Sequence, residues 1–95
     1  MEFVKAASAG TMDSCDISIR LEKGTANKNV IYLTSAVQKQ FGEHIERLIE
    51  DLLNEHGVTG VIVNAVDKGA LDCTISARTI CAIRRACKVE EAHNG

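Results

Sequence analysis

The sequence of 95 residues contains no proline and no tryptophan, and only 3% of it is aromatic. Without proline nothing in the composition marks a linker, so one continuous domain of ordinary small size is expected. So few aromatic side chains cannot form the stacking platform that binds single-stranded nucleic acid. The net charge of −2 also argues against a basic nucleic-acid footprint and against a binder of anionic membranes.

Long apolar runs and metal-type cysteine spacings are missing too. No stretch approaches the ~18 apolar residues that span a bilayer, and no apolar segment of a secretory signal precedes residue 10. The four cysteines form no C-x-x-C pair, so a structural zinc site is not expected. We expect a cytoplasmic protein with reduced thiols, in which Cys73, Cys81 and Cys87 are small apolar core residues.

Hydrophobic alternation predicts four strands. Residues 17–22 alternate between apolar and polar, and residues 30–33 are a short β-branched and aromatic run, so the two are expected to pair as a hairpin. Two further strands are expected at residues 58–66 and 71–75. The loop between them would be a second hairpin turn, with Gly69 at a positive φ.

Apolar spacings of three and four predict two helices, at residues 36–56 and from Ala77 to about residue 88. Ser35 and Gln38 have the spacing of a capping box at the start of the first helix. Gly57 has the position of a left-handed residue that ends this helix in a Schellman motif.

The predicted fold class is α+β, with the element order ββαββα. Runs of strands separated by helices favour a two-layer sandwich, in which a four-stranded, largely antiparallel sheet carries both helices on one face. Residues 1–95 would form a single domain, with flexible ends at residues 1–8 and 89–95.

Few side chains could combine into a catalytic site. Ser14 and His44 could form a nucleophile and base, and Cys15 could be a rival nucleophile, but nothing local marks an oxyanion hole. Asp13 and Asp16 could help to hold Mg²⁺, although two carboxylates in a short loop are more often simply solvated. The residues alone therefore leave Ser14 as a loop serine, a nucleophile or an attachment point.

Three segments carry a resemblance to a known family: AGTMDSCD at residues 9–16, SAVQKQFG at residues 35–42 and DKGALDCTISAR at residues 67–78. Together they resemble the acyl carrier protein, or gamma subunit, of citrate lyase, and the resemblance runs from about residue 8 to residue 87. It implies that Ser14 matches the serine that bears a covalently attached phosphoribosyl-dephospho-CoA prosthetic group in that family.

The resemblance implies a non-catalytic subunit of a multi-subunit lyase. The thiol of the group would carry acetyl, the transferase (alpha) subunit would exchange acetyl for citryl, and the lyase (beta) subunit would cleave the citryl thioester. A separate prosthetic-group transferase would load Ser14, and we hypothesise that it recognises Asp13 and Asp16. No metal, nucleic acid or membrane enters this scheme.

Several alternatives remain open. The carrier subunits of malonate decarboxylase and citramalate lyase are the nearest, although residues 40–42 and 67–78 favour citrate lyase. Ordinary phosphopantetheine carriers fit less well, because their serine opens a helix and Ser14 precedes a strand pattern. A different class is an interaction domain that joins subunits through its sheet or through Arg84 and Arg85, and another is a small enzyme.

Overall fold

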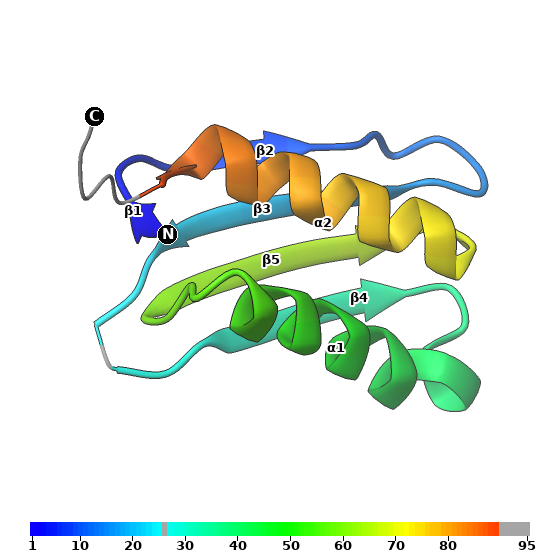
Figure 1. Cartoon of the computed structure of the whole chain (residues 1–95). Helices are drawn as coiled ribbons and strands as arrows, with labels where there is room; N and C mark the ends of the chain where they lie inside the picture. Colours follow the sequence, from blue (N-terminus) through cyan, green and yellow to red (C-terminus); the bar gives the residue numbers. More distant parts are fainter. Residues whose placement is uncertain (26, 90–95) are drawn as a thin grey trace.

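The computed structural model describes residues 1–25 and 27–89, apart from the side chains of residues 38 and 39. This part of the chain forms six strands and two helices, whose arrangement can be followed in Figure 1. In chain order they are β1 (Glu2–Phe3), β2 (Ala7–Ala9), β3 (Ile17–Lys23), β4 (Val30–Ser35), α1 (Gln38–Glu55), β5 (Val61–Asp67), α2 (Asp72–Ala86) and β6 (Cys87–Lys88).

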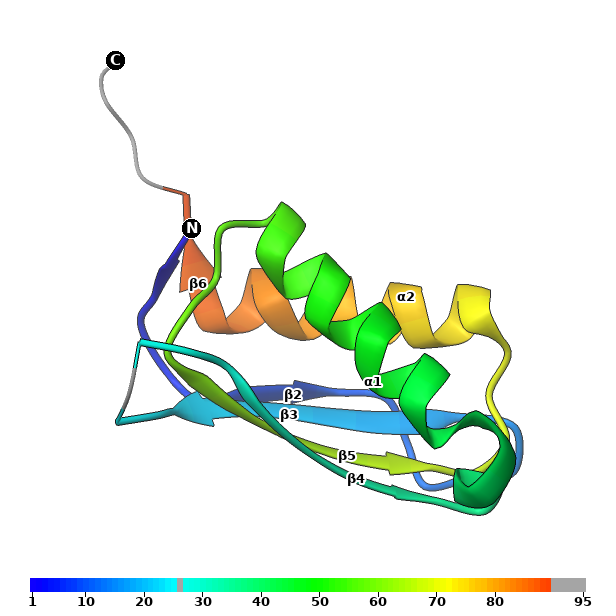
Figure 2. The ribbon, with the colours of Figure 1, turned by 90° about the horizontal axis from the view of Figure 1, so that it is seen from below.

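Four strands form the main sheet in the order β2-β3-β5-β4. The β2–β3 and β3–β5 pairs are antiparallel, and the β4–β5 pair is parallel. Figure 2 shows both helices on the same side of this sheet. The predicted α+β sandwich, with a largely antiparallel sheet of four strands and both helices on one face, is confirmed.

The core lies between the sheet and the two helices. Alternate residues of β3 and β5 point into it, because successive side chains of a strand face opposite sides. From the helices, the core receives residues at spacings of three and four, as expected for one buried helix face. The largest fully buried core side chains are Ile17, Ile19, Leu21, Ile49, Leu53, Val58, Val61, Val63, Ile75 and Ile83.

The predicted hairpin between residues 17–22 and residues 30–33 is wrong. Both segments are strands, β3 and β4, but β5 lies between them and pairs with each. The connection from β4 to β5 runs through α1, and a helical crossover joins parallel neighbours. Since β5 is buried along one whole face, it takes the centre of the sheet, and the half-exposed β4 becomes an edge.

The predicted strand at residues 71–75 is also wrong, because this segment begins α2. Leu71 is 71% exposed and Cys73 is exposed, so the apolar alternation does not correspond to one buried face. Ile75 is buried, and it starts a helical series that continues with Thr79 and Ala82. The fourth strand of the sheet is β2 instead, an Ala-Ser-Ala segment without the β-branched residues that signal a strand.

The predicted C-terminus of α1 is confirmed. Gly57 has a φ of +68°, which only glycine adopts without strain. Its N–H donates to the Asn54 carbonyl at 3.0 Å, and the Val58 N–H donates to the Leu53 carbonyl at 2.9 Å. These are the two hydrogen bonds of a Schellman motif.

The predicted capping box at the other end of α1 does not form through Ser35. Val37 is the N-cap residue, and no side chain caps this end of the helix. The Ser35 hydroxyl instead accepts from the Val37 N–H at 3.1 Å and donates to the buried Asp67 carboxylate at 2.8 Å. The side chain of Gln38, the other half of the predicted box, lies outside the described residues.

Both ends of the described chain meet beside α2. Residues 1–8, where we expected a flexible end, contain β1, which pairs with β6, and most of β2. The Val4 and Lys5 N–H groups both donate to the Ala86 carbonyl, at 2.8 and 3.2 Å. Of the expected flexible tail at residues 89–95, residues 90–95 lie outside the described part. Neither helix in that part has the length and apolar character needed to cross a membrane.

Candidate attachment loop

Ser14 lies in the loop of residues 10–16, which joins β2 to β3 and which we call the serine loop. Figure 1 shows this loop at the end of the sheet where α1 and α2 begin. Residues 11–15 are exposed, and residues 14 and 15 form a turn. Within the described residues no hydrogen bond engages the Ser14 hydroxyl, so its oxygen is open to modification from solvent.

Backbone hydrogen bonds fasten the serine loop to the connection between β5 and α2. The Cys15 N–H donates to the Lys68 carbonyl at 2.8 Å, and the Lys68 N–H donates to the Asp16 carbonyl at 2.9 Å. The Asp16 N–H closes a turn on the Asp13 carbonyl at 3.1 Å. The residues that follow Ser14 are therefore fixed, whereas Ser14 itself projects outward.

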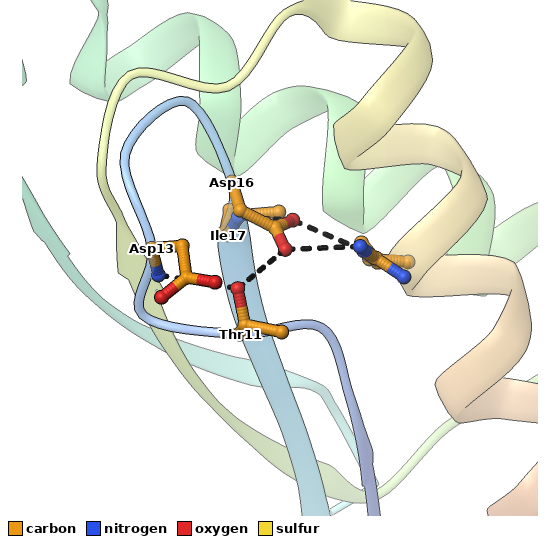
Figure 3. A network of polar contacts seen from close by, with 5 residues as sticks. Thr11, Asp13, Asp16 and Ile17 are labelled. Carbon is orange, nitrogen blue, oxygen red and sulfur yellow. Dashed lines mark hydrogen bonds and ion pairs between the residues drawn. The ribbon is translucent and has the colours of Figure 1, made fainter.

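Asp16 holds the base of the loop through both of its carboxylate oxygens (Figure 3). It is only 8% exposed. Oδ1 accepts from the Ile17 N–H at 2.7 Å and from Arg78 Nε at 3.0 Å. Oδ2 accepts from the Thr11 hydroxyl at 2.7 Å and from Arg78 Nη2 at 2.9 Å. The Thr11 oxygen in turn accepts from the Asp13 N–H at 3.1 Å.

This bidentate pair between Asp16 and Arg78 stays charged at neutral pH. Hydrogen bonds from Arg78, from the Thr11 hydroxyl and from the Ile17 N–H hold the pKa of the Asp16 carboxyl well below its usual range. The carboxylate in turn raises the pKa of Arg78. Asp16 therefore faces the inside of the molecule, so the idea that both loop carboxylates are simply solvated is wrong for Asp16. Asp13 is exposed.

Two positive φ angles shape the loop. Gly10 has a φ of +92°, and a Cβ there would come within 1.8 Å of the Ile17 carbonyl oxygen, so only glycine fits. Cys15 has a φ of +64° and is the only non-glycine residue with a positive φ in the described part of the chain. A left-handed conformation costs an L-residue about 1–2 kcal/mol. The strain therefore lies directly beside Ser14.

Comparison with known proteins places the chain in a family. The family model described as malonate decarboxylase delta subunit (MdcD) matches residues 4–86. The citrate lyase acyl carrier protein of Oenococcus oeni is 52% identical over 94 residues, which are 99% of this chain and 96% of the relative. That of Streptococcus uberis is 48% identical over 91 residues, or 96% of this chain and 89% of the relative.

The chain belongs to the citrate lyase acyl carrier protein family. A solved structure adds agreement on the fold alone. A chain of a Pseudomonas malonate decarboxylase hetero-tetramer in complex with malonate superposes with a TM-score of 0.75 at 21% identity. The match covers 85% of the present chain and 82% of that chain. The sandwich is thus shared by a protein that is distant in sequence from this citrate lyase family member.

The structure does not assemble the catalytic alternative. His44 Nε2 lies 2.7 Å from Asp72 Oδ2, in an exposed pair between α1 and α2, and makes no hydrogen bond with Ser14. Throughout residues 1–25 and 27–89, no three or more His, Cys, Asp or Glu side chains cluster as metal ligands would.

The cysteines divide between surface and core. Cys87 is buried, and burial raises the pKa of its thiol. Cys81 is partly buried and packs against the core. Cys73 is exposed, which corrects its assignment to the core, because it lies in the first turn of α2. Cys15 is exposed in the serine loop.

Arg78 is the important residue that the sequence reasoning missed. It follows Ile75 by three positions and precedes Ala82 by four, which places it beside the buried face of α2. A cation in that position predicts an anionic partner, since a charge that approaches the core needs one. The apolar alternation of residues 71–75 hides this signal, because a strand there excludes Ile75 from the helical series.

Proposed function

We propose that this chain is the acyl carrier subunit of citrate lyase and that Ser14 bears a covalently attached phosphoribosyl-dephospho-CoA group. Family membership supports the carrier role. The main observation in favour of Ser14 is that it lies in an exposed turn. The ion pair between Asp16 and Arg78 fixes the base of this loop. The group would supply a thiol that holds the acyl unit as a thioester.

The residues around Ser14 fit such a group. Its hydroxyl makes no hydrogen bond to other described residues, so a phosphodiester on Oγ would break none. The neighbouring side chains of residues 11–15 are exposed, so a bulky nucleotide displaces no core residue. The anchored loop gives the arm a fixed origin, and tethering then raises the local concentration of the acyl group at a docked active site to about the millimolar scale.

The partners in this proposal are the transferase (alpha) and lyase (beta) subunits of citrate lyase, which would perform the chemistry, and a prosthetic-group transferase that loads Ser14. The hetero-tetramer that contains the structural neighbour supports a role in a multi-subunit complex. The proposal places the chain in the cytoplasm, and its four free cysteines are consistent with a reducing compartment.

The same proposal assigns Asp13, rather than Asp16, to recognition by the loading enzyme. Asp13 is exposed, whereas Asp16 is buried and has both oxygens engaged within the molecule. The hypothesis that the loading enzyme recognises both carboxylates is therefore restricted to Asp13.

A carrier subunit of malonate decarboxylase is the second candidate, favoured by the name of the matching family model and by the structural neighbour. The names of the more similar relatives favour citrate lyase. Citramalate lyase remains a third system. Release of acetate by the loaded native complex on addition of citrate, with none on addition of malonate or citramalate, would decide among them.

Mass measurement of the carrier purified from its native host tests the attachment. We expect intact mass and peptide mapping to find a nucleotide-containing adduct on Ser14, and Ser14→Ala to abolish lyase activity while the protein still folds and co-purifies with its partners. Ser8→Ala, another exposed serine, is the matched control and should keep full activity. An active native complex with unmodified Ser14 would contradict the proposal.

A further inference from the structure

An apolar groove lies between the beginnings of α1 and α2. Its volume is about 340 Å³. Two exposed polar side chains, His44 and Asp72, pair with each other at its edge. The apolar side chains that line it are those of Val37, Phe41, Ile45, Ala70, Leu71 and Ile75.

Two large side chains of this groove are unusually exposed. Phe41 is 50% exposed and Leu71 is 71% exposed, although both border a hollow that would cover them if it were filled. Exposed apolar side chains gathered at one concave place mark a binding site more often than scattered ones do. A third exposed apolar residue, Met12 at 59%, belongs to the serine loop.

The groove lies within reach of Ser14. The Lys68 carbonyl accepts the hydrogen bond of the Cys15 N–H, and Ala70, two residues further on, lines the groove. With about 3.8 Å between successive Cα atoms, the path from Ser14 to Ala70 is about 15–20 Å. Figure 1 shows the serine loop and the first turns of both helices at the same end of the molecule.

We propose that this groove binds the thioester end of the arm on Ser14 while that end carries a small, uncharged acyl group such as acetyl. The inference rests on the proposed function, which supplies the arm. Pantetheine has a dimethyl carbon and methylene units that suit the apolar walls, and its amides can reach the polar edge. Docking there shields the thioester from water between visits to the partner subunits.

The same walls disfavour a citryl group. Among the side chains that the structure describes, no Lys or Arg lines the groove, so the citryl carboxylates would lose water against Phe41 and Leu71 without such a cation. Burial of an unpaired charge is costly. Asp72 adds a like charge at the edge, where its carboxylate is paired with His44. The loaded arm therefore leaves the groove when acetyl is exchanged for citryl, which makes it available to the lyase subunit.

Methyl NMR of the full-length carrier tests the docking. Samples are compared with and without the acetylated arm, after intact mass has confirmed the adduct. We expect the methyl signals of Ile45 and Ile75 to shift on loading. Phe41→Ala should lower the ratio of docked to free arm about tenfold, which corresponds to about 1.4 kcal/mol of lost apolar contact.

Leu71→Ser is a second variant, at a more exposed position. It should also weaken docking, and it keeps the test valid if Phe41→Ala fails to fold. Tyr32→Ala is the matched control. Tyr32 is 60% exposed, between Phe41 and Leu71 in this respect, but its neighbours Ile31 and Leu33 pack against the core. Its side chain therefore points to the opposite face of the sheet. The control should leave the loading shifts of Ile45 and Ile75 unchanged.

The outcomes separate this inference from the proposed function. An adduct on Ser14 that leaves the groove methyls unmoved would overturn the docking alone. Equal shifts with acetyl and citryl would overturn the preference for an uncharged group. Shifts that need added transferase or lyase subunit, and not loading, would make the groove a subunit contact instead. A native complex that is active without an adduct would overturn the proposed function and the docking with it.

Discussion

At the scale of single residues, the serine loop depends on Arg78, a residue far from it in the sequence. Asp16 is one residue from the exposed turn, yet it is buried because Arg78, 62 positions later, and Thr11 neutralise and hydrogen-bond its carboxylate. A charge-assisted bidentate pair is among the stronger polar interactions in proteins. The loop is therefore ordered by Arg78 of α2 as well as by its own turn and its backbone bonds to Lys68.

Acid pH should weaken this anchor. Because the pKa of Asp16 is depressed in the folded state, its contribution to stability is complete above the unfolded value of ~3.9 and is lost as the pH falls below it. We expect the stability difference between the wild type and Asp16→Asn, measured by urea unfolding, to be large at pH 7 and to shrink as the pH falls below ~3.9.

Asp13→Asn is the control for this experiment, because its exposed side chain has no such partner among the described residues. Its stability should stay close to that of the wild type throughout the same pH range. A difference between wild type and Asp16→Asn that stayed constant down to pH values far below ~3.9 would show that the carboxylate charge is not what matters.

Two glycines with the same backbone angle allow a second residue-scale prediction. Gly10 and Gly69 both have a φ of +92°, so alanine at either pays about 1–2 kcal/mol for the left-handed conformation. Only at Gly10 would the new Cβ also collide with the Ile17 carbonyl, since nothing lies within 4 Å at Gly69. We expect chemical denaturation to show Gly10→Ala less stable than Gly69→Ala by about 1–3 kcal/mol.

Equal losses for these two variants would mean that the base of the serine loop can relax away from Ile17. The close approach of Gly10 to the Ile17 carbonyl would then not require glycine at this position. The pair is matched, because both glycines lie in connections at the end of the sheet that carries Ser14.

At the scale of elements, Asp67 joins β4, β5 and the entry to α2. It is 1% exposed at the end of β5. Its carboxylate accepts from the Ser35 hydroxyl at 2.8 Å and from the Ala70 N–H at 2.9 Å, and its carbonyl accepts from the Ala36 N–H at 3.2 Å. This one side chain fixes where α2 begins relative to the end of β4.

Removal of that carboxylate should be costly. Asp67→Ala leaves the partly buried Ser35 hydroxyl and Ala70 N–H without their partner, and an unsatisfied group costs about 1–3 kcal/mol when it is fully buried. We expect thermal or urea unfolding to report a loss of stability within that range. Asp51→Ala, at an exposed position of α1, should change stability by no more than about 0.5 kcal/mol. An equal response from the two variants would refute the linking role of Asp67.

The element scale also explains which predictions failed. The helix at residues 36–56 and its glycine ending were predictable because an 18-residue amphipathic series is a strong local signal. Residues 71–75 were not, because five residues with three apolar side chains fit a strand and a helix equally well. The strand pairing was wrong because periodicity shows that a segment is a strand but does not name its neighbour.

At the scale of the whole molecule, one end of the sandwich gathers the serine loop, the connection between β5 and α2, and the beginnings of both helices (Figures 1 and 2). The other end carries the chain's N-terminal strand β1 paired with β6. A carrier needs a stable domain that presents its attachment point at the surface. In this arrangement the proposed attachment point and the proposed docking groove lie at the same end of the domain.

The sequence by itself determined the fold class, the long helix α1 and its ending, the strand character of β3, β4 and β5, and the family to which the chain belongs. These follow from local periodicity, from residues with special backbone freedom, and from extended similarity. Only the tertiary structure decided that β5 separates β3 from β4, that α2 begins at Asp72, and that Arg78 binds Asp16. Those features depend on contacts between residues far apart in the chain, whose energies no local pattern records.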